Sequence, residues 1–199
     1  KASMIWCASS CGKMSHGAMP LSGLNPIPPM ISILEKMRQL EEEEIERLGM
    51  NPFLGYPSIT PTVLQAPVKG EPQLNVVPYQ CRALLDIRTI PGQSYEVLKK
   101  QLEDIVREEE RSIHESLHSG SLNEIRESLE KGLSRGILFE ARLNFFEDRP
   151  WTKTPQDEPI VQAVSRAYRS VAGEEPTYDG VPGATDGTFL SAWAGIPIV

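Results

Sequence analysis

The chain has 199 residues, of which 40% are hydrophobic and 24% are charged, values typical of a globular protein of one or two domains. Its net charge of -7 offers no basic face, which argues against nucleic acid and membrane as partners. The three cysteines lack the Cys-x-x-Cys spacing of zinc or redox sites. No apolar run approaches the roughly 20 residues that span a bilayer. The expected location is therefore the cytoplasm.

The first elements are a short strand over residues 4–9, a glycine turn and a helix. Asn25 is expected to cap this helix, because its side chain can accept a hydrogen bond from a free backbone N–H, and Pro26 suits the first helical position. Apolar residues at helical spacing continue the helix until Gly49. We expect the acidic run 41–44 to be a solvated face of it.

The middle of the chain alternates between strand and helix patterns. A strand is expected over residues 62–66, and a clearer one over 81–88, where apolar residues alternate with polar ones such that one face is core. A helix capped by Ser94 follows. Residues 119–136 are expected to form a polar surface excursion, and the alternation of residues 137–145 predicts another strand. The order predicts an α+β fold, a split βαβ (ferredoxin-like) domain with an antiparallel sheet and two helices on one face.

The last part of the chain has a different pattern. Residues 151–159 are expected to be a linker, followed by an amphipathic helix that stops at Gly173. A glycine-rich loop, a short helix near residues 188–194 and an apolar, strand-like end at 196–199 complete the chain.

Three sequence stretches occur in an order that is informative. The first is a glycine turn over residues 12–20 that contains His16, the second is Asn75-Val-Val-Pro thirteen positions before Arg88, and the third is Gly-Ala-Thr-Asp-Gly at 183–187. Together they resemble the dinuclear zinc amidohydrolases and exopeptidases of the succinyl-diaminopimelate desuccinylase, acetylornithine deacetylase, aminoacylase and carboxypeptidase G type. The resemblance covers the chain from about Gly12 to its end.

The resemblance implies a domain arrangement. Residues 1–11 would end one part of the catalytic domain, 12–149 would form the lid (dimerisation) domain, and 150–199 would be a partial C-terminal segment of the α/β metallohydrolase domain. The family's metal ligands, which begin with a His-x-Asp pair, cannot be placed in this sequence. Two zinc ions, or cobalt or manganese, are therefore expected in the complete enzyme and none on this chain alone.

By the same resemblance, His16 is expected to be the catalytic residue of this chain. It would cross a dimer interface and donate a hydrogen bond to the oxyanion in the partner's active site. Asn75 would donate an amide N–H to the substrate. The alternatives are a surface histidine beside a turn and an asparagine that opens a turn.

Arg88 and the glycine-rich loop are the other expected substrate contacts. The guanidinium of Arg88 would hold a substrate carboxylate, although an ion pair with Asp86 on the same sheet face is the alternative. The loop residues Gly183, Ala184 and Thr185 would present backbone N–H groups to the carboxylate end of the substrate. The family usually has a second glycine where this chain has Ala184.

We therefore expect this chain to be part of a metal-dependent hydrolase that cleaves the C–N bonds of N-acyl amino acids or small peptides. The enzyme would form a homodimer through its lid. This chain alone would be inactive. One alternative is a non-catalytic homodimerisation or binding module. A second is a zincin-type protease, because His114-Glu115-Ser-Leu-His118 places two histidines on one helix face with a glutamate as base.

Overall fold

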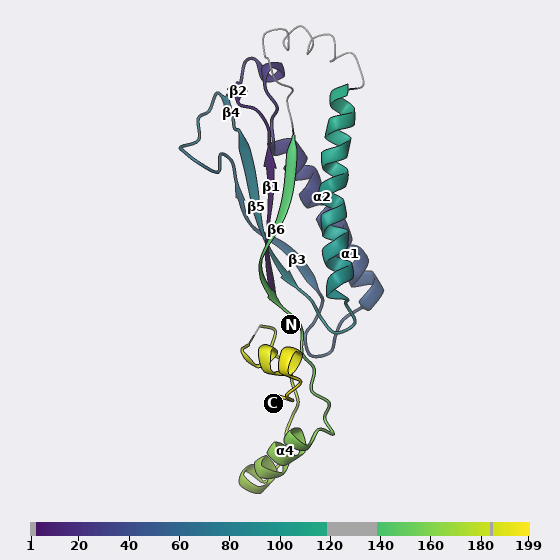
Figure 1. Ribbon diagram of the computed structural model, residues 1–199. Helices are drawn as coiled ribbons and strands as arrows, with labels where there is room; N and C mark the ends of the chain where they lie inside the picture. The colour runs from purple at the N-terminus through teal and green to yellow at the C-terminus, as the bar shows by residue number, and fades with distance from the viewer. Residues whose placement is uncertain (1–2, 119–138, 184) are drawn as a thin grey trace.

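A four-stranded antiparallel sheet with two helices on one face is the centre of this computed structural model, which describes residues 3–118, 139–183 and 185–199 (Figure 1). The sheet order is β3-β5-β1-β6. In chain order its elements are β1 (Ser3–Cys11), α1 (Ile27–Leu48), β3 (Ser58–Gln65), β5 (Gln80–Arg88), α2 (Tyr95–His118) and β6 (Glu140–Arg149). This confirms the predicted α+β class and the strand-helix-strand-strand-helix-strand order.

The strand β1 is longer than expected. It lies between β5 and β6 and is paired from Met4, opposite Ile87, to Cys11, opposite Gln80. The strand therefore continues two residues beyond Ser9, because both neighbours continue to offer hydrogen-bonding partners. Residues 3–11 thus belong to the same sheet as the strands that fall within 12–149.

The helix α1 begins one residue later than predicted. The N–H of Ile27 donates to the side-chain oxygen of Asn25 at 3.0 Å, so Asn25 does cap the first turn, but Pro26 lies before the helix. Gly49 ends the helix as predicted, with φ 66° and its N–H on the carbonyl of Ile45. The first of the two strands predicted in the middle of the chain begins at Ser58 rather than at residue 62.

The acidic run 41–44 is only partly solvated, so that prediction is wrong for two of its residues. Glu44 is 8% exposed, and Glu41 accepts a hydrogen bond from the backbone N–H of Ile59 at 2.8 Å. The reason is that α1 crosses over the start of β3 and the turn after β5, which brings Glu41 to a backbone donor and Glu44 to the side-chain amide of Gln93.

The hydrophobic core lies between the sheet and the two helices. The predicted alternation over 81–88 is confirmed, since every second residue of β5 from Cys81 to Ile87 is buried while its neighbours are half-buried. Buried side chains of α1, α2 and the segment before β6 pack against this face: Ile33, Met37, Leu40, Leu98, Leu102, Val106 and Phe139.

We expect Leu85→Ala to destabilise the protein by about 3 kcal/mol, because Leu85 is fully buried in this core and its truncation leaves a cavity. Urea denaturation followed by circular dichroism measures the change. Leu21→Ala is the matched control, since Leu21 is 47% exposed, and its free energy of unfolding should change by less than about 0.5 kcal/mol. Equal losses for the two variants would contradict this description of the core.

The C-terminal segment contains α4 (Pro159–Ala172) and the π-helix η2 (Phe189–Trp193). The amphipathic helix ends at Gly173 as predicted, with φ 75°. The strand expected at 196–199 is not formed, because a strand needs a neighbour to complete its hydrogen bonds and none of the described residues supplies one there.

Two expectations reach beyond the described residues. The surface excursion at 119–136 and the start of the strand predicted over 137–145 lie outside them; the described part of that strand is β6. Of the helices that the structure does describe, none has the length and apolar character to cross a membrane.

Candidate functional site

His16 lies on a small ribbon beyond one end of the main sheet. The ribbon consists of β2 (Ser15–His16) and β4 (Val76–Val77), which pair antiparallel with His16 opposite Val76. It follows β1 and precedes β5 in the chain, so it lies at the end of the sheet where Cys11 pairs with Gln80 (Figure 1).

Glycines allow the turn around His16 to pack tightly. Lys13 and Leu24 exchange two backbone hydrogen bonds of 2.9 Å, which close the turn at its base. A Cβ on Gly12 would lie 2.0 Å from the carbonyl oxygen of Leu24, and one on Gly23 would lie 2.6 Å from that of Lys13. Only glycine fits at these two positions, so the backbone that carries His16 is held in one arrangement.

The structure brings His16 and Asn75 together. The Nδ1 atom of His16 accepts a hydrogen bond from the N–H of Ala18 at 3.1 Å, which leaves Nε2 as the ring nitrogen able to donate. The side-chain amide of Asn75 lies 3.3 Å from that Nε2, and the Asn75 carbonyl accepts from the N–H of Gly17 at 2.7 Å. Both side chains are exposed. The pair therefore places an imidazole nitrogen and a side-chain amide next to each other at the surface.

Arg88 lies at the opposite end of β5 and is already paired. Its Nη2 donates to Oδ2 of Asp86 at 2.8 Å, and its Nε lies 2.7 Å from Oδ1. This is the ion pair that was the alternative to a substrate contact. Both side chains are about one-third exposed, so the guanidinium still has an open side.

The glycine-rich loop lies at the Arg88 end of the sheet. Arg149 closes β6 opposite Ser3, and its Nη1 lies 4.0 Å from Oδ1 of Asp186 in the loop. Its guanidinium also lies over the ring of Phe189, 5.2 Å from the ring centre. A Cβ on Gly183 would meet only one atom within 4 Å, at 3.9 Å.

Thr185 is the other predicted loop residue that the structure describes. Thr185 is exposed, and its carbonyl accepts the N–H of Thr188 at 3.0 Å. Ala184 lies outside the described residues.

The predicted site residues thus form two groups. β5 runs nine residues from Gln80 to Arg88. At about 3.3 Å per residue its two ends are roughly 26 Å apart. His16 and Asn75 lie beyond one end, whereas Arg88 and the loop lie at the other.

Gln93, which no sequence pattern indicated, connects several elements near the Arg88 end of β5. Gln93 is 6% exposed; its side chain donates to Glu44 at 2.8 Å and accepts the N–H of Ile90 at 3.0 Å. Its backbone carbonyl accepts a hydrogen bond from the indole of Trp151 at 3.3 Å. Gln93 therefore joins the end of α1, the turn after β5 and the start of the C-terminal segment. A glutamine in a Pro-Gly turn has no sequence signature that would have identified it.

Glu44 makes the stability of this junction dependent on pH. The adjacent Arg47 guanidinium, and then the Gln93 amide, hold the pKa of Glu44 below its ordinary value of 4.5. A lowered folded-state pKa means that the stabilisation is present above about pH 4.5 and is lost as the pH falls through the folded-state pKa. We expect Glu44→Gln to lower the melting temperature at pH 7 and to flatten its fall between pH 5 and pH 3.

Arg47→Gln should flatten the same part of the profile, because it removes the largest cause of the shift. Melting curves of both variants against pH test this. A Glu44→Gln profile parallel to that of the unaltered protein would contradict it.

The rival histidine motif lies on α2 and serves the fold. Nε2 of His114 lies 2.9 Å from the carbonyl oxygen of Phe139, a contact that ties the helix to the start of β6. The side chain of His118 lies outside the described residues. Within the part of the chain that the structure describes, no three His, Cys, Asp or Glu side chains converge as a metal centre requires. The described residues therefore do not fit a metal site; the zincin alternative, which needs the side chain of His118, stays a prediction.

Comparison with known proteins places this geometry in a family. Residues 5–114 match the family model of the peptidase dimerisation domain, M20_dimer. A search of curated proteins finds no match. Solved structures match over nearly the whole chain, and since their sequence identity is low they show the fold.

Three of these structures illustrate the likeness. A tripeptidase from Staphylococcus aureus has 17% identity and a TM-score of 0.55, covering 98% of this chain and 42% of its own. An M20 family metallo-carboxypeptidase from Sulfolobus solfataricus has 16% identity and a TM-score of 0.57, with coverages of 98% and 49%. A di-peptidase from Saccharomyces cerevisiae has 13% identity and a TM-score of 0.56, with coverages of 97% and 46%.

This chain spans less than half the length of these solved proteins. The matched residues contain both parts of the His16–Asn75 ribbon and the whole of β5, and more than half of the chain lies within the match. The chain belongs to the M20 peptidase dimerisation domain family.

Proposed function

We propose that this chain is the lid and part of the catalytic domain of a metal-dependent hydrolase that cleaves amide bonds in N-acyl amino acids or small peptides. The separation of His16 and Asn75 from Arg88 and the glycine-rich loop, along the length of β5, carries the proposal. The peptidases named above, which act on peptides, support the substrate class.

The two groups of residues would act on one substrate only if they come from two subunits. An acyl amino acid is far shorter than the roughly 26 Å between the ends of β5. In a homodimer whose lids associate antiparallel, the His16 end of one subunit faces the Arg88 end of the other. The edge strand β3 supports such an association, since no described strand pairs with its outer side and its residues Val63 and Leu64 are exposed.

Each side chain then has a chemical task. The Nε2–H of His16 donates to the oxyanion that develops on the scissile carbonyl, and Asn75 holds the substrate amide or carbonyl beside it. Arg88 turns the open side of its guanidinium to the substrate carboxylate while Asp86 keeps the group in position. We propose that the divalent metal ions, zinc or alternatively cobalt or manganese, are held by ligands that are not among the described residues of this chain.

The C-terminal segment supports the assignment of residues 150–199 to a catalytic domain. The helix α4 exposes the apolar side chains of Val164, Tyr168 and Val171, a face that an adjoining part of such a domain would cover. We also propose a cytoplasmic location, in keeping with the unpaired thiols of Cys11 and Cys81.

The test is hydrolysis of N-acyl amino acids and dipeptides. One sample is this chain alone. The other, the supplemented enzyme, is the chain together with a segment that carries the metal ligands of an M20 peptidase. We expect no metal-dependent hydrolysis by the chain alone and measurable hydrolysis by the supplemented enzyme. Hydrolysis by the chain alone would contradict the proposal. A homodimer that stays inactive after supplementation would favour the non-catalytic binding module instead.

A further inference from the structure

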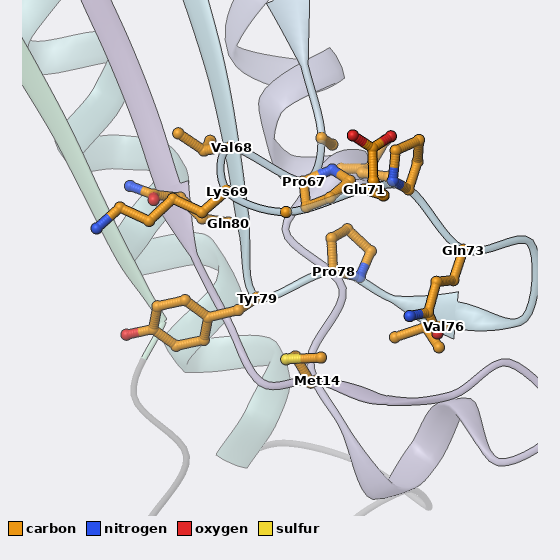
Figure 2. Close-up of a pocket in the computed structure, with 14 residues that line it drawn as sticks. Met14, Pro67, Val68, Lys69, Glu71, Gln73, Val76, Pro78, Tyr79 and Gln80 are labelled. Atoms are coloured by element: carbon orange, nitrogen blue, oxygen red, sulfur yellow. The ribbon is translucent and has the colours of Figure 1, made fainter.

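A cavity of about 510 Å³ is lined in part by Val76, the residue opposite His16 in the β2–β4 ladder (Figure 2). One wall is the loop that contains Pro67 and Lys69, and the other is formed by Met14, Val76 and Pro78. Its volume falls in the range of roughly 300–1,000 Å³ that small-molecule sites occupy. The cavity plays no part in the contacts assigned so far to His16, Asn75 and Arg88.

The cavity and His16 lie on the same face of the ribbon. His16 is directly opposite Val76 in the β2–β4 ladder, and directly opposed residues share a face. Val76 lines the cavity, as do Met14 and Pro78, which flank the two strands of the ribbon. The cavity therefore adjoins the face on which His16 lies.

The chemistry of the walls favours an apolar, uncharged ligand group. Most of the lining residues are aliphatic, proline or methionine, and the two charged ones, Lys69 and Glu71, are of opposite sign. In Figure 2, Lys69 extends away from Met14 and Pro78, so no cation projects between these two apolar side chains. A charged group placed between Met14 and Pro78 would lose its hydration without gaining a charged partner there.

We propose that this cavity binds the apolar side chain or acyl group of the substrate whose scissile carbonyl faces His16. The inference rests on the proposed function and makes it more specific. The preferred substrates carry an aliphatic or aromatic group next to the cleaved amide. The lid of one subunit selects that group for the active site of its partner. Met14, Val76 and Tyr79 determine the specificity.

Binding to the 199-residue chain tests the cavity without requiring catalysis. The probes are N-acetyl-phenylalanine amide and, as the charged counterpart, N-acetyl-aspartate amide, observed through methionine methyl resonances by NMR. The methyl signal of Met14 should shift with the phenylalanine probe, whereas that of Met50, which is also exposed but lies outside the cavity, should not. The aspartate probe should bind at least tenfold more weakly.

Two variants locate the binding. Val76→Asp should lower the affinity for the phenylalanine probe at least fivefold. Tyr79→Ser should lower the affinity by a smaller factor, and since the side chain of Tyr79 is exposed, this variant should fold. An unshifted Met14 signal, equal shifts at Met14 and Met50, or equal affinity for the two probes would each overturn the proposal.

His16→Ala separates this proposal from the proposed function. Probe binding requires the cavity alone, whereas hydrolysis also requires His16 and the metal ions, so His16→Ala should abolish hydrolysis by the supplemented enzyme and still show the Met14 shift with the phenylalanine probe. Binding by the chain together with an inactive supplemented enzyme would refute the hydrolase and leave the cavity as a binding site. Hydrolysis with no preference for apolar substrates and no shift at Met14 would refute the cavity alone.

Discussion

A mixture of His16→Ala and Arg88→Ala subunits is expected to recover roughly a quarter of the activity of the unaltered supplemented enzyme, although each variant alone is nearly inactive. His16→Ala removes one oxyanion donor, which typically costs about 10²–10³ in kcat. Arg88→Ala removes charge-assisted hydrogen bonds to the substrate carboxylate, worth on the order of a hundredfold in kcat/KM. Both residues are intact together in the mixture only if one active site takes them from different subunits.

The expected recovery follows from the geometry of a two-fold dimer. Random reassociation makes half of the dimers mixed, and in each mixed dimer one site has both residues and the other has neither. The measurement is kcat/KM after the two variants have been unfolded together and refolded. Recovery no greater than the sum of the parents would show that one subunit supplies both residues.

The double variant is the control for this experiment. A subunit carrying both His16→Ala and Arg88→Ala, mixed with His16→Ala, contains no dimer with a complete site. It should therefore show no recovery. Recovery in this mixture would indicate that subunit exchange alone, rather than a shared site, raises the activity.

The central fold was predictable because its signals are local. Alternation over 81–88 follows from a strand with one buried face, and Gly49 and Gly173 end helices through the backbone freedom that only glycine has. The junction of Glu44 with Gln93 was not predictable, since it depends on which element α1 crosses. The sequence pattern indicates that Glu44 is solvated, whereas in the fold it is buried.

The candidate site shows the same division between local and long-range information. The sequence indicated His16, Asn75 and Arg88 but not their placement, because 59 positions separate His16 from the Asn75 side chain that it meets. Only the β2–β4 register brings these two together, and only the length of β5 keeps Arg88 apart. The distance that points to a shared active site is thus a property of the sheet and not of any motif.

The turn below His16 provides the second large effect. Gly12→Ala is expected to destabilise the protein by about 2–4 kcal/mol and to lower the activity of the supplemented enzyme at least tenfold. The new Cβ would lie 2.0 Å from the carbonyl oxygen of Leu24, so the two backbone hydrogen bonds between Lys13 and Leu24 must open to admit it. Each lost bond costs about 1 kcal/mol, and the backbone N–H and C=O groups of the half-buried Lys13 and Leu24 lose their partners.

The readouts are the free energy of unfolding and the NMR signals of the His16 ring, whose position depends on this turn through Ala18 and Asn75. Gly55→Ala is the matched control. Gly55 has φ 69° and open space around it, so a methyl group there costs only the backbone strain of about 1 kcal/mol and leaves the His16 signals unchanged. Because the two glycines differ in what surrounds them, a Gly12→Ala variant that behaves like Gly55→Ala would mean that the His16 turn is not held by close packing. The imidazole would then depend on the partner subunit for its position.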